Sequence, residues 1–266
     1  MTATATLPPL HAPHTGGDPD VALVELRAVI EHSIAHQPRT LQTEIGPSEL
    51  GGCEHCLAAR LAGMVENETG VAWLPFVGTA VHAALAEFVI AHENDRGAQH
   101  TTGLRYLSEQ EVTVGVIAGQ PISGHLDLFD THTGIVVDFK IVGATTLRAA
   151  KSGPTDQYRT QVHLYGKGMA NAGHQVDHVA IAYLPRNAVT LGAAIWWHEP
   201  YDETVAIDAL ERANRLHTNI AVLRDALGDP AVAAWVANLP RDPHCFSCAR
   251  YPDAPASPSP LADLIG

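Results

Sequence analysis

Hydrophobic and polar residues follow two different spacings along the chain, and the changes of spacing predict its elements. Residues 21–36 and 77–95 carry apolar side chains at helical intervals. Residues 108–119 and 121–130 alternate apolar and polar positions instead, and 134–143 follows after the turn-like sequence THTG. The first half of the chain is therefore predicted to form two helices and then three strands in meander order.

The second half of the chain repeats these two spacings. A helix is predicted over 155–173 and a buried strand over 177–186, with 193–200 pairing beside that strand. Residues 202–238 return to helical spacing, interrupted by a Gly-Asp-Pro sequence that separates two helices. This order of elements predicts an α/β fold in which helices flank a central mixed sheet.

Composition sets the expected organisation of the chain. One folded domain is predicted over residues 21–250, because residues 1–20 and 251–266 lack periodicity, are rich in Pro and Ala, and indicate a flexible leader and tail. Apolar residues make up 46% of the 266, as in soluble globular proteins. No uninterrupted apolar run reaches about 18 residues and no signal-peptide pattern opens the chain. We therefore expect a cytoplasmic protein without a membrane segment.

The charge balance limits the possible partners. Lys and Arg number 16 against 29 Asp and Glu, which gives a net charge of −13. Broad, unspecific affinity for nucleic acid is disfavoured, because phosphate contacts require clustered cations. A nucleic-acid-binding protein is still compatible with this balance. A metal-binding groove must itself concentrate carboxylates, and a local basic patch could line the rest of the groove.

Two acids, Asp127 and Asp138, interrupt apolar strand-like runs in the sequence GHLDLFDTHTGIVVDFK. If the two runs form a hairpin around THTG, the two acids are predicted to lie nearly opposite each other, about 4.5 to 5.5 Å apart. A divalent cation would relieve their repulsion, and Lys140 is predicted to share a strand face with Asp138. The alternative is a plain ion pair of Lys140 with either acid at a sheet edge.

Four short motifs, in order along the chain, resemble those of one enzyme family. They are GxxxH at Gly78–His82, GHLD at Gly124–Asp127, DFK at Asp138–Lys140 and QVHLY at Gln161–Tyr165. Together they resemble the RecB-like, Cas4-like branch of the PD-(D/E)XK nuclease superfamily. The resemblance covers roughly residues 45–250 and implies a restriction-endonuclease-like core.

The resemblance also implies roles for individual residues. The catalytic side chains it implies are Lys140, Asp138, Asp127, Gln161 and Tyr165. The implied metal ligands are His82, Asp127, Asp138 and the backbone carbonyl of Ile141. Mn²⁺ or Mg²⁺ is the implied ion, and the imidazole favours Mn²⁺, because it is a softer ligand than oxygen. The implied reaction is attack of a metal-activated water on a phosphodiester.

The four cysteines form two C-x₂-C pairs. They are Cys53 with Cys56, in CEHC, and Cys245 with Cys248, in CFSC. This spacing indicates a metal site, and disulfides are the less favoured interpretation in a cytoplasmic protein. Zinc and a [4Fe–4S] cluster both fit four thiolates, and spacing alone leaves zinc at least as favoured.

The family resemblance favours the iron–sulfur cluster at this site. Cys56 and Arg60, in GPSELGGCEHCLAARL, match places in the corresponding segment of Cas4-like nucleases. Those relatives have one cysteine there and three near the C-terminus, whereas this chain has two and two, so Cys53 would supply the missing ligand. In either case the four-cysteine site is predicted to join the N- and C-terminal segments across the core.

The predicted function is that of a metal-dependent DNA exonuclease acting on single strands or DNA ends. Arg148, Lys151 and Arg159 flank the site in sequence and are predicted to contact phosphates. The resemblance implies phage or CRISPR-associated DNA recombination, with a recombination or CRISPR adaptation protein as a possible partner, and it leaves oligomerisation open. The alternative is a catalytically silent module that binds DNA ends or a protein partner and contains a structural zinc site.

Overall fold

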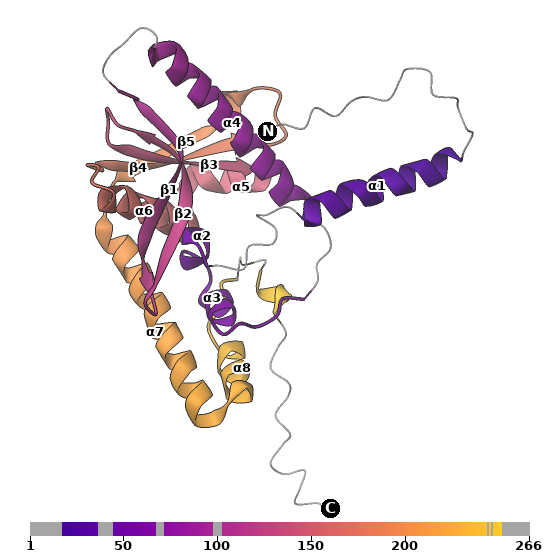
Figure 1. The fold of residues 1–266 in the computed structure, drawn as a ribbon, viewed down its shortest axis with the longest axis vertical. Helices are drawn as coiled ribbons and strands as arrows, with labels where there is room; N and C mark the ends of the chain where they lie inside the picture. The colour runs from indigo at the N-terminus through magenta and orange to yellow at the C-terminus, as the bar shows by residue number, and fades with distance from the viewer. Residues whose placement is uncertain are drawn as a thin grey trace, which may run out of the picture. The chain divides into compact units, whose positions relative to one another are not determined.

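The computed structural model describes residues 18–36, 45–67, 72–97, 103–243, 245 and 247–251. The helices are α1 (Pro19–Ala35), α2 (Pro47–Leu50), α3 (Glu54–Leu61), α4 (Trp73–Gly97), α5 (Ala144–Ala149), α6 (Asp156–Asn171), α7 (Glu203–Leu227) and α8 (Asp229–Ala237). The strands are β1 (Tyr106–Ile117), β2 (Gln120–Asp130), β3 (Ile135–Val142), β4 (His178–Pro185) and β5 (Ile195–Pro200) (Figure 1). Nearly all of the predicted leader and tail lies outside the described residues.

The chain divides into two compact units. One consists of Met1–Gln42 with Val71–Trp73, and the other of Thr43–Gly70 with Leu74–Gly266. In the first unit, Asp18 is the N-cap of α1, and its carboxylate accepts a hydrogen bond from the backbone N–H of Asp20 at 2.9 Å. Apart from α1, every element named above lies in the second unit, except that α4 begins at Trp73 of the first.

The five strands form one mixed sheet in the order β1-β2-β3-β4-β5. The pairs β1–β2, β2–β3 and β4–β5 are antiparallel, and β3–β4 is parallel. A parallel pair requires a crossover, and α6 supplies it here between β3 and β4. The predicted α/β class, the meander of the first three strands and the central mixed sheet are therefore confirmed.

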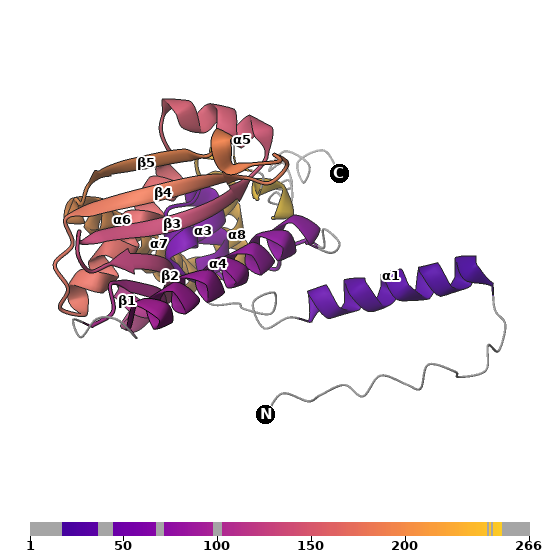
Figure 2. The ribbon, with the colours of Figure 1, turned by 90° about the horizontal axis from the view of Figure 1, so that it is seen from above.

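Helices flank both faces of this sheet. Neighbouring residues of a strand point to opposite faces, and in β3 Lys140 contacts α6 while the ring of Phe139 lies 6.3 Å from that of His82 in α4. Helix α6 is covered on more than one side, since both Val162 and Leu164 are fully buried. Figures 1 and 2 show α7 packed beside α6, with α8 following it. The sheet therefore lies between α6 and α4.

Helix α4 is apolar over most of its length. Its segment Trp73–Asp95, 23 residues long, could cross a membrane judged by length and composition alone. Polar but uncharged side chains such as Thr79 and His82 interrupt the apolar run without adding fixed charge. The sequence-based prediction considered uninterrupted apolar runs and therefore did not single out this segment. In the fold, α4 instead places His82 against the sheet.

The sequence pattern did not predict the short helices α2, α3 and α5. Helix α2 is stabilised locally, because the carboxylate of Glu49 accepts a hydrogen bond from the backbone N–H of Gly46 at 2.9 Å. Gly51 then follows α2 and lies directly against the backbone of α6, where a Cβ atom would overlap the carbonyl oxygen of Gln157. Glycine at this position lets the end of α2 approach α6 closely.

We expect Gly51→Ala to lower the free energy of unfolding by about 1 to 3 kcal/mol, because the added methyl group meets rigid backbone and forces the two segments apart. Urea unfolding followed by circular dichroism would measure the change. Gly78→Ala is the matched control, since nothing lies within 4 Å of a Cβ atom at that helical position and the substitution should be neutral or stabilising. Equal losses in both variants would contradict the close approach at Gly51.

Candidate functional site

The site lies at the β2–β3 fork, the point where strands β2 and β3 separate next to Asp127 and Asp138. These strands pair at Asp130–Ile135, Phe129–Val136 and Leu128–Val137, and the recorded pairing ends there. The next residues along this register are Asp127 and Asp138, so the predicted near-opposite placement of the two acids agrees with the register. The Asp127 carboxylate turns into the gap, where its Oδ2 accepts the backbone N–H of Phe139 at 2.6 Å. A backbone donor thereby holds one carboxylate at the point where the strands separate.

Helix α4 adds a histidine to this fork. Nδ1 of His82 lies 2.9 Å from Oδ1 of Asp127, and both side chains are largely buried. Burial disfavours the imidazolium, but the hydrogen bond and the charge of Asp127 outweigh it and raise the pKa of His82. The structure therefore brings together two of the residues that the sequence predicted as metal ligands.

A third acid, Glu109 of β1, completes this group. One potential ligand atom each from His82, Glu109 and Asp127 lies within 4.8 Å of the other two. Glu109 has a φ of 51°, which is uncommon for a residue other than glycine. Its neighbours Ser108 and Gln110 pair with β2, but the recorded pairing skips Glu109. The irregular backbone thus occurs at the residue that adds an acid to the group.

Sequence reasoning missed Glu109, and the reason is a shift of register. Counting back from the turn with the Ile117–Gln120 pairing would place Glu109 opposite Leu128. The register changes between Thr113 and Gly115, so the pairs on either side of Glu109 place it opposite Asp127 instead. Glycine at 115 is compatible with such an irregularity, but alternation alone does not locate it.

The second acid of the fork, Asp138, has a different partner. Its Oδ2 lies 2.8 Å from Nζ of Lys140, and the residue is only 3% exposed. Burial raises the pKa of Asp138 to about 6, the nearby charge of Asp127 adds to this effect, and Lys140 opposes it. Apart from the ion pair with Lys140, Oδ2 has no hydrogen bond within the described part of the chain. This buried oxygen is therefore able to coordinate a metal cation.

Lys140 is held from three sides. Besides Asp138, its ammonium donates to Oε1 of Gln161 at 2.8 Å and lies 4.8 Å from the centre of the Tyr158 ring. Both partners belong to α6, whose N-cap residue Thr155 accepts a hydrogen bond from the backbone N–H of Tyr158 at 3.3 Å through its side chain. Gln161, one of the residues that the family resemblance implies for the site, thus contacts the lysine directly, while the cation–π contact with Tyr158 was not predicted.

The two remaining predicted site residues also lie close to the fork. Tyr165 is buried on α6, and its ring packs against Gly124 of β2, where an added Cβ atom would lie 3.3 Å from the ring. Ile141 follows Lys140 in β3 and is opposite Leu184 in β4. The catalytic role of Tyr165 and the role of the Ile141 carbonyl as a ligand stay predictions.

The three cations predicted to contact DNA fall into two groups. Arg148 on α5 and Lys151 just after it are exposed. The Nε of Arg159 on α6 instead lies 2.6 Å from Oε1 of Glu199. Arg159 also lines a groove of about 440 Å³ between α6 and α7, together with Arg212. Arg159 is therefore engaged by an acid, whereas Arg148 and Lys151 are exposed to solvent.

The four cysteines meet at a second site. Sγ of Cys53 lies 3.4 Å from that of Cys248, and Sγ of Cys56 lies 3.6 Å from that of Cys245 and 3.5 Å from that of Cys248. All four sulfurs lie within 4.8 Å of one another. These separations exceed an S–S bond of about 2.05 Å, so the thiols are free. The prediction that a four-cysteine site joins the N- and C-terminal segments is confirmed.

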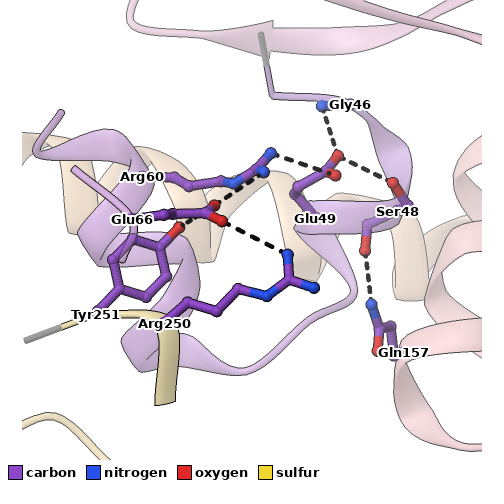
Figure 3. Close-up of polar contacts among 8 residues, drawn as sticks. All are labelled: Gly46, Ser48, Glu49, Arg60, Glu66, Gln157, Arg250 and Tyr251. Carbon is purple, nitrogen blue, oxygen red and sulfur yellow. Dashed lines mark hydrogen bonds and ion pairs between the residues drawn. The ribbon is translucent and has the colours of Figure 1, made fainter. Parts of the chain in front are cut away.

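A polar network connects the same two segments beside the cysteines. Figure 3 shows the carboxylate of Glu66 among Arg60, Arg250 and Tyr251. It accepts hydrogen bonds from the Tyr251 hydroxyl at 2.9 Å and from Arg60 at 3.1 Å, and it lies 3.5 Å from Arg250. Arg60 also reaches Glu49 at 3.4 Å. Arg60, which the family resemblance had marked, therefore anchors the C-terminal segment.

The comparisons with known proteins give only distant similarities. No protein-family model matches the chain, and no curated protein sequence matches it. Among solved structures, the alkaline exonuclease LHK-Exo from Laribacter hongkongensis is 11% identical, with a TM-score of 0.43, over 70% of this chain and 91% of that one. SSO0001 is 15% identical, with a TM-score of 0.41, over 82% and 92%.

A phage-related exonuclease from Haemophilus somnus is 11% identical, with a TM-score of 0.32, over 64% of this chain and 94% of that one. Similarities at this level do not assign a family or an activity. The class of this protein is therefore defined by its own fold and sites. It is an α/β protein with a five-stranded mixed sheet, helices on its faces and a four-cysteine cluster.

Proposed function

We propose that this protein is a metal-dependent nuclease that hydrolyses phosphodiester bonds in DNA, as an exonuclease acting on single strands or ends. The observation that carries the proposal is the arrangement at the β2–β3 fork. There an imidazole–carboxylate pair, His82 with Asp127, adjoins a buried carboxylate–ammonium pair, Asp138 with Lys140. Metal-assisted phosphodiester hydrolysis needs anionic ligands for a cation and a positive group for the developing charge.

The residues of the fork fit a divalent cation. His82, Glu109 and Asp127 offer one nitrogen and two carboxylate oxygens close together, and the buried Oδ2 of Asp138 offers a further oxygen nearby. Such a donor set suits Mn²⁺ or Mg²⁺, with the imidazole favouring Mn²⁺. When bound, the cation would lower the pKa of a coordinated water and neutralise charge on the phosphate.

Lys140 performs the part of the chemistry that belongs to the chain itself. Its ammonium is proposed to orient the attacking water or to stabilise negative charge on the reacting phosphate. Gln161 and the Tyr158 ring hold the ammonium in place, which limits the reorganisation needed during the reaction. The exposed Arg148 and Lys151 are proposed to contact the DNA backbone.

The motif resemblance supports a more specific assignment within the nuclease superfamily. The order of the four motifs favours the RecB-like, Cas4-like branch, and with it a role in phage or CRISPR-associated DNA recombination in the cytoplasm. The absence of a G-x-x-x-x-G-K-[ST] sequence means that the chain carries no helicase motif of that type.

Cleavage of end-labelled linear DNA tests the proposal. Single-stranded and duplex substrates, labelled at either end, would be incubated with Mn²⁺, with Mg²⁺ or with EDTA. We expect metal-dependent release of nucleotides by the wild type, no release by Asp127→Asn, and normal release by Glu203→Gln, whose carboxylate pairs with Lys167 at the surface. DNA binding without cleavage under every condition would establish the silent binding module instead.

Glu109→Gln should weaken Mn²⁺ binding by about tenfold or more, because it removes one anionic donor from the group without changing side-chain volume. Calorimetric titration of Mn²⁺ into the DNA-free protein would measure this independently of cleavage. Glu111→Gln is the matched control, since Glu111 is an exposed acid on the same strand opposite His125. Unchanged affinity in Glu109→Gln would exclude Glu109 from the metal site.

A further inference from the structure

We propose that the four cysteines hold a single tetrahedral zinc ion rather than the [4Fe–4S] cluster that the family resemblance implies. The observation is the spacing of the sulfurs, which distinguishes one shared ion from a cluster of four irons. This inference concerns a site separate from the β2–β3 fork. It stands whether or not the protein cleaves DNA.

Four thiolates on one zinc ion lie close together. Zn–S bonds of about 2.3 Å at tetrahedral angles place neighbouring sulfurs about 3.8 Å apart. The three recorded separations, 3.4, 3.5 and 3.6 Å, are close to this value, and no pair among the four exceeds 4.8 Å. A small outward movement of each sulfur would create the tetrahedral site.

A [4Fe–4S] cluster requires a much wider arrangement. Each cysteine then binds a different iron and points away from the centre of the cube, so the cysteine sulfurs stand about 6 Å apart. To accept the cluster, every pair of sulfurs would have to separate by more than 1 Å, since all pairs are now within 4.8 Å. Cys53 and Cys56 belong to the start of α3, whose other turns are buried at Leu57 and Ala58. This packing resists such an expansion.

The pairing of the cysteines gives independent support. Two C-x₂-C pairs from distant segments are typical of tetrahedral zinc sites, in which each pair supplies two ligands from one tight turn. Here Cys53 occupies the N-cap position of α3, and its sulfur accepts a hydrogen bond from the backbone N–H of Asp242 at 3.4 Å. The second pair comes from the turn that precedes Tyr251. The arrangement therefore has the two-plus-two form expected of one shared ion.

Metal analysis of the full chain tests the proposal. The protein would be produced anaerobically with iron and zinc both supplied, and then analysed for zinc, iron and acid-labile sulfide. We expect one zinc ion per chain, no sulfide and no cluster absorbance, and replacement of zinc by Co²⁺ should give the spectrum of a tetrahedral tetrathiolate. Iron with stoichiometric sulfide, or iron without zinc, would overturn the proposal.

Two variants keep the test specific. The double variant His82→Ala/Asp127→Asn should retain its zinc, because we expect the ion at the cysteines. If the zinc were bound at the β2–β3 fork instead, this double variant would lose it. Cys245→Ser should lose the ion, and X-ray absorption on the wild type, which needs no variant to fold, should show zinc–sulfur distances of about 2.3 Å without iron neighbours. Nitrogen or oxygen ligands at the zinc would equally contradict a four-cysteine site.

Discussion

Replacing Lys140 with methionine is expected to reduce DNA cleavage by at least about a hundredfold while leaving the fold intact. The methionine retains much of the apolar length of the lysine but removes the charge that lies 2.8 Å from both Asp138 and Gln161. A group that acts only in the transition state should lower kcat and kcat/KM together, with little change in DNA binding. Initial rates on end-labelled DNA, with binding measured separately, would show this.

Lys167→Met is the matched control for this variant. Lys167 lies on α6, and its ammonium pairs with Glu203 at 2.7 Å rather than with a residue of the fork. We expect Lys167→Met to cleave DNA at nearly the wild-type rate. Equal activities in all three proteins would mean that the Asp138–Lys140 pair is only structural, and thermal unfolding would verify that Lys140→Met is folded.

Removing a ligand from the cysteine site should have the largest effect on stability. Cys56→Ser is expected to lower the free energy of unfolding by several kcal/mol, on the order of 5, because an ion that binds only the folded chain contributes its binding energy to folding. Cys56 is an informative choice, since its sulfur contacts those of both Cys245 and Cys248. Urea unfolding with and without chelator would measure the loss.

Limited proteolysis would locate that loss. Cleavage of Cys56→Ser should begin in the C-terminal segment that contains Cys245 and Cys248, before the sheet is attacked. Ser247→Ala is the control, because it changes the same turn without touching a sulfur. If Cys56→Ser and Ser247→Ala unfold at the same urea concentration, the four sulfurs do not hold a stabilising ion.

The features that were predictable from the sequence are those set by local periodicity. Alternation around the turn at 131–134 was enough to place Asp127 and Asp138 in neighbouring register, because a short hairpin leaves few alternatives. The same approach did not place Glu109, because a register shift farther along β1 intervenes. Helices α2 and α3 were not predicted either, since they are too short to show a helical period and pack against distant elements, α2 on α6 and α3 on α7.

Two features required information from beyond local sequence. The C-x₂-C pairs indicated a metal site, but only the distances among the sulfurs distinguish one ion from a cluster. The cation–π contact between Lys140 and Tyr158 depends on how α6 crosses the sheet, which spacing does not define.

The sparse burial of α4 has a thermodynamic consequence. Only 6% of its most apolar window is buried, yet this helix supplies His82 to the fork. Asp127, Asp138, Lys140 and Gln161 all come from one continuous stretch of β2, β3 and α6, so the helix that brings the imidazole is the component least supported by packing. A cation bound by His82 would therefore stabilise the docked position of α4, and occupancy of the site would be linked to hydrogen-exchange protection of that helix.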